Sequence, residues 1–557
     1  MSPSSSSLLK ILERTRSDYG LGRAAVKLSL LQDLQHRRLK SAPEILRLHE
    51  HLCYLRAYPD DGAVLARVVR MLEGFAGRAD FKRHQITLAD TGIAGTVIHY
   101  QFFWPTARWL AARWPERLHI DWENIDNVRP LADALPLLVT PLEATWLRLR
   151  MPSPKRSLMR LKGAKIADGT FFVRRVEVMP GDHVTREAFF DGLDTPFRLR
   201  PGRSTPSRTM THNPPSPVVF RAAPPERARP DLLRELRRPP RSVTAVASNE
   251  GDRLIDLARV AMVTRERDLD NFAYGDCRDV RMVDDGDGLQ WIVIGTLPER
   301  RPILRATYGL LTLRNGVPIG YVGADALFGC VDISYNTFPT YRGGEAAFVF
   351  ARMLAALRQL FGARTFTIEP YQLGQGNDEA IESGAWWFYY KLGFRPRNPA
   401  IGALAREELA RMKASPRHRS SHRVLKQLAG DYLYFETPGA TAPYWPRLTD
   451  FGKKITEHLT ARAETRREDA LSACCADAQQ RLNAAPARGS GKQRLAAWLN
   501  WSPVVALLPG IERWTQEERN QLAQIITAKG SRRDSDYLAL FDAHPKLGRM
   551  LRRLTRS

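Results

Sequence analysis

The sequence lacks the features of a membrane or secreted protein. Its longest purely apolar run in the C-terminal part, Val504 to Leu508, lies between two prolines and is far shorter than the roughly 18 residues that a membrane helix needs. Five scattered cysteines do not suggest a disulfide framework, and no C-x-x-C pair suggests a zinc or redox site. The serine-rich N-terminus has no long apolar core of the kind that secretory signals contain. We therefore expect a cytoplasmic protein with no membrane span and no bound metal.

The positive charge is unevenly distributed along the chain. The formal net charge is +24, yet residues 251–400 contain 17 Lys and Arg against 18 Asp and Glu. The basic excess lies before and after this segment, where it either binds an anionic partner or reflects a general preference for arginine. The second interpretation is favoured, because diffuse arginine without a recognition motif is weak evidence for nucleic-acid binding.

Five regions are expected in these 557 residues, because one hydrophobic core does not usually organise so long a chain. Helical spacing of apolar residues predicts helices near the N-terminus, and dense prolines, which lack a backbone donor, predict a linker or extended arm. The regions are a helical one (1–80), a mixed α/β one (81–200), a Pro/Arg-rich linker (201–241), a mixed-sheet module (242–400) and a mostly helical basic one (401–557).

The module carries the clearest pattern. Thr307 to Leu313 and Pro318 to Ala324 flank Asn315-Gly316, a pair that tolerates positive φ and predicts a β-hairpin. Val331 to Phe338 predicts a further strand. A glycine turn then opens a helix from Glu345 to Phe361, and the free N–H groups at such a helix start suit an anion such as a pyrophosphate.

Two more elements complete the module. Phe366 to Glu369 predicts a short strand that Pro370 ends. A helix is expected from Gly384 to Leu392, capped by Ser383 and terminated by the glycine that follows it.

Two motifs of this module resemble a known family. Phe338-Pro339-Thr340-Tyr341-Arg342-Gly343 and Tyr389-Tyr390-Lys391-Leu392-Gly393-Phe394, in this order, resemble the acyl-CoA-binding half of the GCN5-related N-acetyltransferase (GNAT) superfamily. The resemblance covers about residues 242–398. It implies a mixed α/β sheet, acyl-CoA as co-substrate, and acyl transfer to an amine acceptor whose identity the sequence does not reveal.

The resemblance also implies site residues. Thr337 and Phe338 would pair with the pantetheine arm of CoA like an additional strand. The pyrophosphate would bind the Arg342 side chain and the backbone N–H groups of the loop. The loop residues are Arg342, Gly343, Gly344, Glu345, Ala346 and Ala347.

Catalytic roles follow in the same way. Tyr389 matches the family tyrosine that protonates the departing thiolate, and a positioned phenol offsets the charge that develops there. Glu369, Asp332 or water would accept the amine proton.

One departure from the family pattern keeps other functions open. Glu345 replaces a glycine of the loop, and a carboxylate beside a pyrophosphate would repel it unless turned outward. The donor is then an acyl-CoA or an acyl group on a carrier protein, with the basic flanks recruiting an acidic partner. The alternatives are a degenerate GNAT-fold scaffold and a nucleic-acid-associated basic protein.

Overall fold

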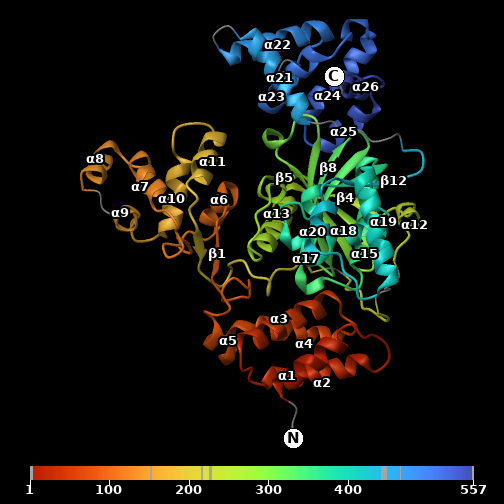
Figure 1. The fold of residues 1–557 in the computed structure, drawn as a ribbon. Coiled ribbons are helices and arrows are strands. Elements are labelled where there is room, and N and C mark those ends of the chain that lie inside the picture. Colours follow the sequence, from red (N-terminus) through yellow and green to blue (C-terminus); the bar gives the residue numbers. More distant parts are fainter. Residues whose placement is uncertain are drawn as a thin grey trace. The chain divides into compact units, whose positions relative to one another are not determined.

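The computed structural model of the chain (Figure 1) describes residues 4–150, 153–214, 217–224, 229–440, 448–463, 466–487 and 489–554. Residues 215–216 and 225–228 of the predicted linker, and the last three residues of the basic C-terminus, lie outside them. The chain forms two compact units. The first contains Met1–Pro225, Arg253–Tyr274 and Arg314–Pro318, and the second contains Glu226–Asp252, Gly275–Leu313 and Ile319–Ser557.

The first unit begins with the helices predicted for residues 1–80. Leucines at helical spacing, among them Leu9, Leu31 and Leu48, are fully buried and form one core. The helices are α1 (Ser5–Thr15), α2 (Arg23–His36), α3 (Ala42–Ala57), α4 (Gly62–Glu73) and α5 (Ala79–His84).

A second core in this unit combines helices with a small antiparallel sheet of order β1-β3-β2. Buried aromatics such as Phe102 and Phe172 fill this core, as large rings commonly do. Its elements are β1 (Ile98–Tyr100), α6 (Trp104–Arg113), β2 (Leu118–Ile120), α7 (Arg129–Ala134), α8 (Pro141–Arg150), α9 (Pro154–Leu161), α10 (Asp168–Glu177), α11 (His183–Gly192), β3 (Phe197–Leu199), α13 (Ser248–Val263, most of which lies in this unit) and α14 (Asp270–Ala273).

Part of the Pro/Arg-rich segment is packed within the first unit, whereas the sequence suggests a solvated linker. Thr209 is fully buried, its hydroxyl lies 2.9 Å from Nε2 of His49, and its carbonyl accepts a 2.6 Å hydrogen bond from Arg56. Arg208 forms a 2.8 Å ion pair with Glu50. These contacts explain why the segment is packed rather than solvated, because its buried polar groups form hydrogen bonds and an ion pair with the helices of the first unit.

The second unit is built on a nine-stranded mixed sheet of order β11-β12-β10-β9-β8-β7-β6-β5-β4. The mixed α/β class expected from the sequence is thereby confirmed. The strands are β4 (Ser242–Ala245), β5 (Gly275–Gly286), β6 (Leu289–Thr296), β7 (Ala306–Arg314), β8 (Val317–Leu327), β9 (Cys330–Thr337), β10 (Thr365–Ile368), β11 (Arg395–Pro396) and β12 (Leu433–Glu436).

The hairpin and the long helix of the module form as predicted. Asn315 and Gly316 join β7 and β8 with φ of 46° and 73°. Helix α15 (Ala346–Phe361) is apolar on nearly all sides and correspondingly buried, and it ends at Gly362, which has a φ of 64°. It connects β9 to the parallel strand β10, so its first turn lies near the carboxyl end of β9.

The sheet extends beyond the predicted module. Strand β12, which follows residue 400, pairs antiparallel with β10 and with β11. The remaining helices of the unit are α12 (Leu232–Leu236), α16 (Pro370–Leu373), α17 (Asp378–Ser383), α18 (Ala385–Leu392), α19 (Pro399–Ala414), α20 (His422–Leu428), α21 (Leu448–Arg462), α22 (Arg467–Leu482), α23 (Lys492–Leu507), α24 (Gln516–Lys529), α25 (Asp534–Ala543) and α26 (Leu547–Leu554).

One predicted cap is wrong. Ser383 ends α17 and donates its hydroxyl to the Ala380 carbonyl at 3.0 Å, and Gly384 stands at the N-cap of α18 with a φ of 70°. The glycine produces a sharp turn between two short helices, and the second of them, α18, is the helix that the sequence predicts. No helix in the described ranges is long and apolar enough to cross a membrane.

Candidate functional site

A split in the sheet positions the candidate site. Strands β9 and β10 pair in parallel at only three positions, from Cys330–Thr365 to Asp332–Thr367. Strand β9 then continues to Thr337, still paired with β8, while β10 ends at Ile368. The edge of β9 that faces away from β8 therefore loses its partner strand after Asp332. Crevices at the carboxyl ends of parallel strands are common ligand sites.

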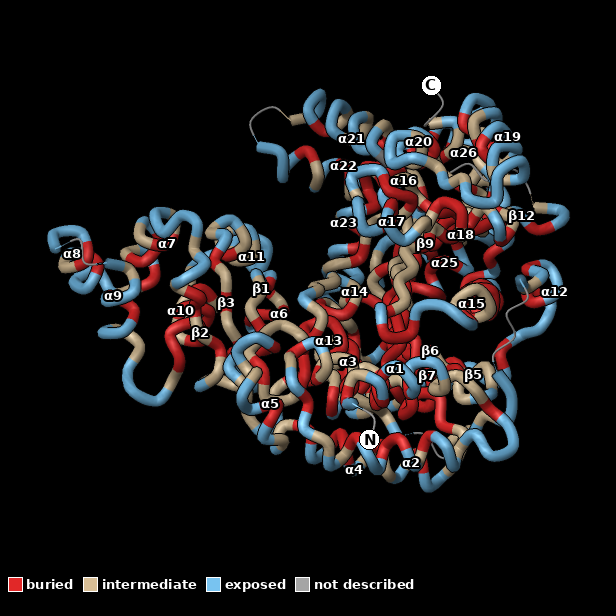
Figure 2. Tube along the Cα trace, turned by 60° about the horizontal axis from the view of Figure 1, so that its bottom comes forward, coloured by how far each residue is buried: buried red, intermediate tan, exposed pale blue. Residues whose placement is uncertain are grey.

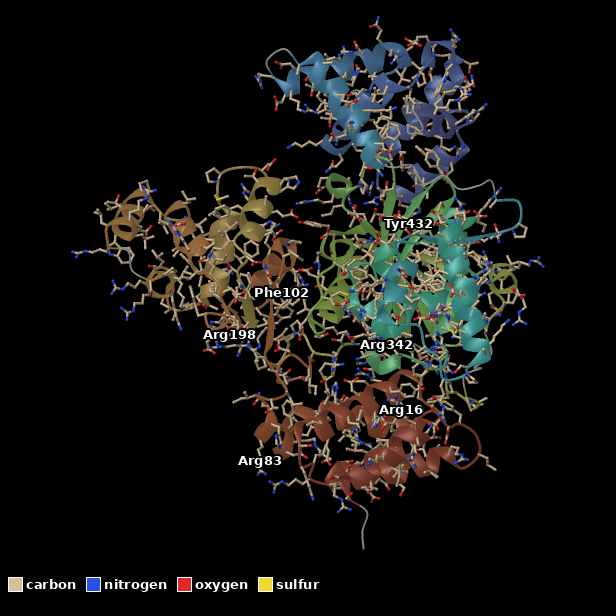
Figure 3. All side chains as sticks on the ribbon, viewed as in Figure 1. Arg16, Arg83, Phe102, Arg198, Arg342 and Tyr432 are labelled. Carbon is tan, nitrogen blue, oxygen red and sulfur yellow. The ribbon has the colours of Figure 1, made fainter. Side chains whose placement is uncertain are left out.

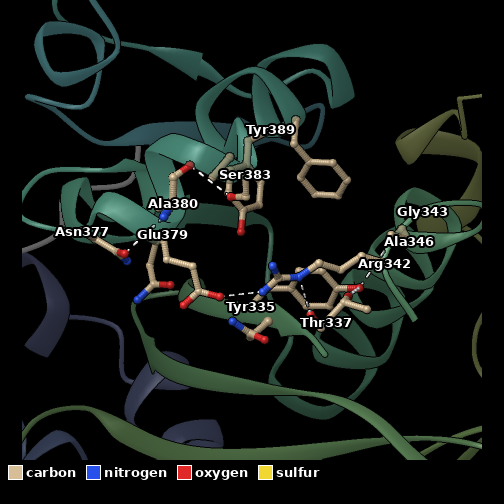
Figure 4. Close-up of a pocket in the computed structure, with 14 residues that line it drawn as sticks. Tyr335, Thr337, Arg342, Gly343, Ala346, Asn377, Glu379, Ala380, Ser383 and Tyr389 are labelled. Carbon is tan, nitrogen blue, oxygen red and sulfur yellow. Dashed lines mark hydrogen bonds and ion pairs between the residues drawn. The ribbon is translucent and has the colours of Figure 1, made fainter. Parts of the chain in front are cut away.

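A pocket of about 250 Å³ lies at this split (Figure 4). Strand β9, the loop before α15, and the segment from α16 to α18 form its wall. The lining residues are Tyr335, Asn336, Thr337, Arg342, Gly343, Ala346, Gln372, Asn377, Glu379, Ala380, Ser383, Ala385, Phe388 and Tyr389. The volume is slightly below the roughly 300–1,000 Å³ of drug-sized ligand sites, so the pocket holds part of a large ligand.

Tyr389 lies on α18, across the pocket from Arg342 and Tyr335 (Figure 4). Tyr389 is 3% exposed, and its ring makes edge contacts with Phe350 and Phe394. No described residue forms a hydrogen bond with its hydroxyl. Burial and the neighbouring Tyr335 raise the pKa of Tyr389, so the phenol stays protonated at neutral pH and retains a proton to donate.

Tyr335 connects the strand to the helix start. Its hydroxyl accepts a 2.9 Å hydrogen bond from Thr337 and lies 3.4 Å from the Ala346 carbonyl, to which it donates. Burial raises the pKa of Tyr335 to about 12, and the nearby charge of Glu345 acts in the same direction. Tyr335 therefore fixes the first turn of α15 against β9.

The loop before α15 has the glycine geometry that an anion cradle requires. Gly343 and Gly344 have φ of 98° and 53°, which other residues rarely adopt. Two N–H groups of the predicted cradle are already used inside it: Arg342 donates to the Pro339 carbonyl at 3.3 Å, and Ala346 donates to the Gly343 carbonyl at 3.2 Å. The predicted set of donors is therefore smaller than the sequence suggests.

Arg342, labelled in Figures 3 and 4, is held at the pocket by two contacts. Its Nε donates to the Thr337 carbonyl at 3.0 Å, and its Nη2 pairs with Glu379 at 2.6 Å. Both side chains of this ion pair are more than a third exposed, at 39% and 49%. An exposed pair of this kind is weak, so an anionic ligand can replace Glu379 as the partner of Arg342.

Glu345 is turned inward rather than outward. It is 8% exposed, stands at the N-cap of α15 with an ordinary φ of −109°, and is absent from the pocket wall. Its charge influences Tyr335. A carboxylate at this position is stabilised by the positive end of the helix dipole.

The proposed bases lie apart from the pocket wall. Asp332 stands at the last β9–β10 pair, and strand alternation directs its side chain to the opposite face from Tyr335. Thr367 donates a 2.7 Å hydrogen bond to it. Burial raises the pKa of Asp332 to about 7 against the lowering effect of that bond, and the charge of Glu369 adds to the rise. A carboxyl group with this pKa suits a general base at neutral pH.

The pocket brings together Thr337, Arg342, Gly343, Ala346 and Tyr389 of the predicted site, and Phe338, Gly344, Glu345 and Ala347 do not line it. Phe338 is buried, and its N–H donates to the Ile319 carbonyl on β8, so it is not free to pair with a ligand. Sequence reasoning assigned no site role to the wall residues between Gln372 and Ala385. Tyr335 could have been found, because it shares a strand face with Thr337.

A second hollow of about 940 Å³ lies beside the first and shares Ser383 and Phe388 with it. Helices α17 to α20 form its wall. Its lining is largely apolar and includes Trp387, Leu409 and Met412. The Phe388 side chain therefore stands between a small pocket and a larger groove.

Within the described parts of the chain, no group of His, Cys, Asp and Glu has an arrangement that could hold a metal ion. Comparison with protein-family models, with curated proteins and with solved structures finds no match for this chain.

Proposed function

We propose that the protein transfers an acyl group from a thioester donor, an acyl-CoA or an acyl group on a carrier, to an amine. The observation that supports this most is the buried Tyr389 hydroxyl in a pocket at the split between β9 and β10, beside the loop that opens α15. The order of strand, glycine turn, apolar helix, strand and aromatic helix is also the order that the GNAT resemblance implies.

The donor would lie along the open edge of β9. Thr337 has its side chain in the pocket, and an extended pantetheine arm fits beside a strand that has lost its neighbour. The pyrophosphate would reach the positive end of α15 and Arg342, after displacing Glu379. The thioester would then lie near Tyr389.

The amine would approach from the other face of the sheet, where Asp332 and Glu369 lie. Its lone pair attacks the thioester carbonyl, the C–S bond breaks as the C–N bond forms, and Tyr389 donates a proton or a hydrogen bond to the leaving thiolate. Asp332, with a pKa of about 7, would accept the proton that the amine nitrogen loses. Donor and acceptor thus meet across the split.

Calorimetric titration with CoA, acetyl-CoA and pantetheine tests the donor site. We expect CoA to bind more tightly than pantetheine, because only CoA carries the pyrophosphate. Arg342→Gln should remove most of this difference. The control is Arg358→Gln, which changes an exposed arginine near the C-terminal end of α15 and should leave the difference unchanged. Glu345→Gly tests whether the buried carboxylate weakens the site.

Absence of CoA binding in wild type, Glu345→Gly and Glu379→Gln would refute a CoA site. The closed Arg342–Glu379 pair favours a second candidate in that case, a non-catalytic protein that retains the fold. Binding in Glu379→Gln but not in wild type would show a donor site that this ion pair closes.

A further inference from the structure

Helices α8 and α9 of the first unit carry an unusual surface. Residues 141–165 contain seven cations and a single acid, Glu143. The cations are Arg148, Arg150, Lys155, Arg156, Arg160, Lys162 and Lys165. None of the seven forms an ion pair with any residue that the structure describes, although many other arginines of the chain are paired. We call residues 141–150 and 153–165 the α8–α9 surface.

Large apolar side chains stand among these cations. Leu142 and Leu149 on α8 are 82% and 78% exposed, and Met159 on α9 is 55% exposed. Each helix still has an inward side, since Leu147 and Leu158 are buried in the core (Figure 2). The exposed leucines are seven residues apart and thus lie on one side of α8. Exposed apolar side chains that stand among cations favour a partner that offers both apolar and anionic groups.

The combination of cations and exposed leucines matches one kind of partner best. Amphipathic helices with Lys and Arg beside apolar side chains bind at the surface of anionic lipid bilayers, where the apolar groups enter the headgroup boundary and the cations meet phosphates. Nitrogen-tipped side chains surround the lobe that contains α8 and α9 in Figure 3.

Nucleic acid fits this surface less well. Phosphate contacts need cations but no exposed leucine, and single strands are usually held by stacking on exposed aromatic rings. Trp146 is the one aromatic residue between 141 and 165, it is only partly exposed, and the Arg160 guanidinium covers its ring at 5.8 Å. A stacking platform is therefore absent from the described part of this surface.

We infer that the α8–α9 surface binds the anionic face of a lipid bilayer, with the leucines of α8 entering the headgroup region and the cations of both helices contacting lipid phosphates. This function is separate from the proposed acyl transfer, and neither depends on the other. It gives a role to part of the basic charge that lies outside the sheet module.

Co-sedimentation of the full chain with vesicles tests the inference. We expect binding to vesicles of phosphatidylcholine mixed with phosphatidylglycerol, little binding to phosphatidylcholine alone, and weaker binding at high salt. The double variant Lys155→Gln, Arg156→Gln should weaken vesicle binding about 25-fold, because each cation near an anionic membrane contributes roughly fivefold to the affinity. Lys10→Gln with Arg14→Gln, two exposed cations of α1, is the matched control and should leave binding unchanged.

A second variant separates lipid from nucleic acid. Leu142→Ser with Leu149→Ser changes two exposed positions and should leave the fold intact. It should weaken vesicle binding and leave the affinity for a short DNA duplex unchanged. Equal binding to neutral and anionic vesicles, unchanged vesicle binding in both double variants, or binding to the duplex without binding to vesicles would each overturn the inference.

Discussion

Replacement of Tyr389 by phenylalanine separates a catalytic hydroxyl from a packed ring. The ring contacts of Tyr389 with Phe350 and Phe394 remain available to phenylalanine. No described residue forms a hydrogen bond with the hydroxyl, so Tyr389→Phe removes no bond of the folded state. We expect the free energy of unfolding to change by less than about 1 kcal/mol.

The expected effect on the rate is larger. Proton donors of this kind contribute about 10²- to 10⁴-fold. The pKa of Tyr389 lies above its usual range, and therefore above that of a thiol at roughly 8.5, so full proton transfer to the thiolate is uphill. The phenol would then act mainly as a hydrogen-bond donor. We expect a loss at the lower end, about 10²-fold, which equals roughly 2.7 kcal/mol of activation free energy.

The assay measures thiol release from acetyl-CoA with hydroxylamine and a panel of amines, and calorimetry measures acetyl-CoA affinity in parallel. Tyr335→Phe is the matched control. It removes the hydroxyl that accepts from Thr337 and donates to Ala346, at a cost of about 1 kcal/mol in stability. An unchanged rate in Tyr389→Phe, or an equal loss in both variants, would refute the acid role of Tyr389.

Three further results are expected. Asp332→Asn should abolish any rise in rate as pH increases through about 7. Because burial raises the folded-state pKa of Asp332 to about 7, the stability of wild type relative to this variant should be highest below pH 3.8 and fall by roughly 2 to 4 kcal/mol as pH rises to about 7. Thermal melts across this range measure the change. Arg352→Met should lower the free energy of unfolding by about 3 kcal/mol in urea titrations, because the buried Asp285 and Glu235 both lose a partner, and Asp285→Asn in the same chain should recover part of the loss. Phe388→Ala should join the pocket to the groove and improve binding of octanoyl-CoA relative to acetyl-CoA; an unchanged ratio in calorimetry would show that the ring does not separate them.

Local signals account for what the sequence predicts well. The Asn315-Gly316 turn, the apolar helix that ends at Gly362, and strands β9 and β10 all depend on positive φ or on apolar periodicity within a few residues. The motif resemblance, rather than these local signals, pointed to Arg342, Gly343 and Tyr389, which line a single pocket.

What the sequence does not predict depends on contacts between distant residues. Strand β12 follows residue 400 in the sequence and lies between β10 and β11 in the sheet. No short sequence pattern predicts a pairing between such distant residues. Thr209 is buried by hydrogen bonds to His49 and Arg56, more than 150 residues away, so proline and arginine content alone could not reveal it.

Charge placement shows the same limit within the candidate site. The sequence indicates a repulsive carboxylate at Glu345 and a free cation at Arg342. In the folded chain Glu345 is buried at the start of α15, and Arg342 is paired with Glu379 from a helix that the sequence does not predict. A phosphate bound at Arg342 would thus compete with Glu379, an exposed and weak partner. Glu379→Gln should therefore affect donor affinity more than Glu345→Gly, a ranking opposite to the one that the sequence alone suggests.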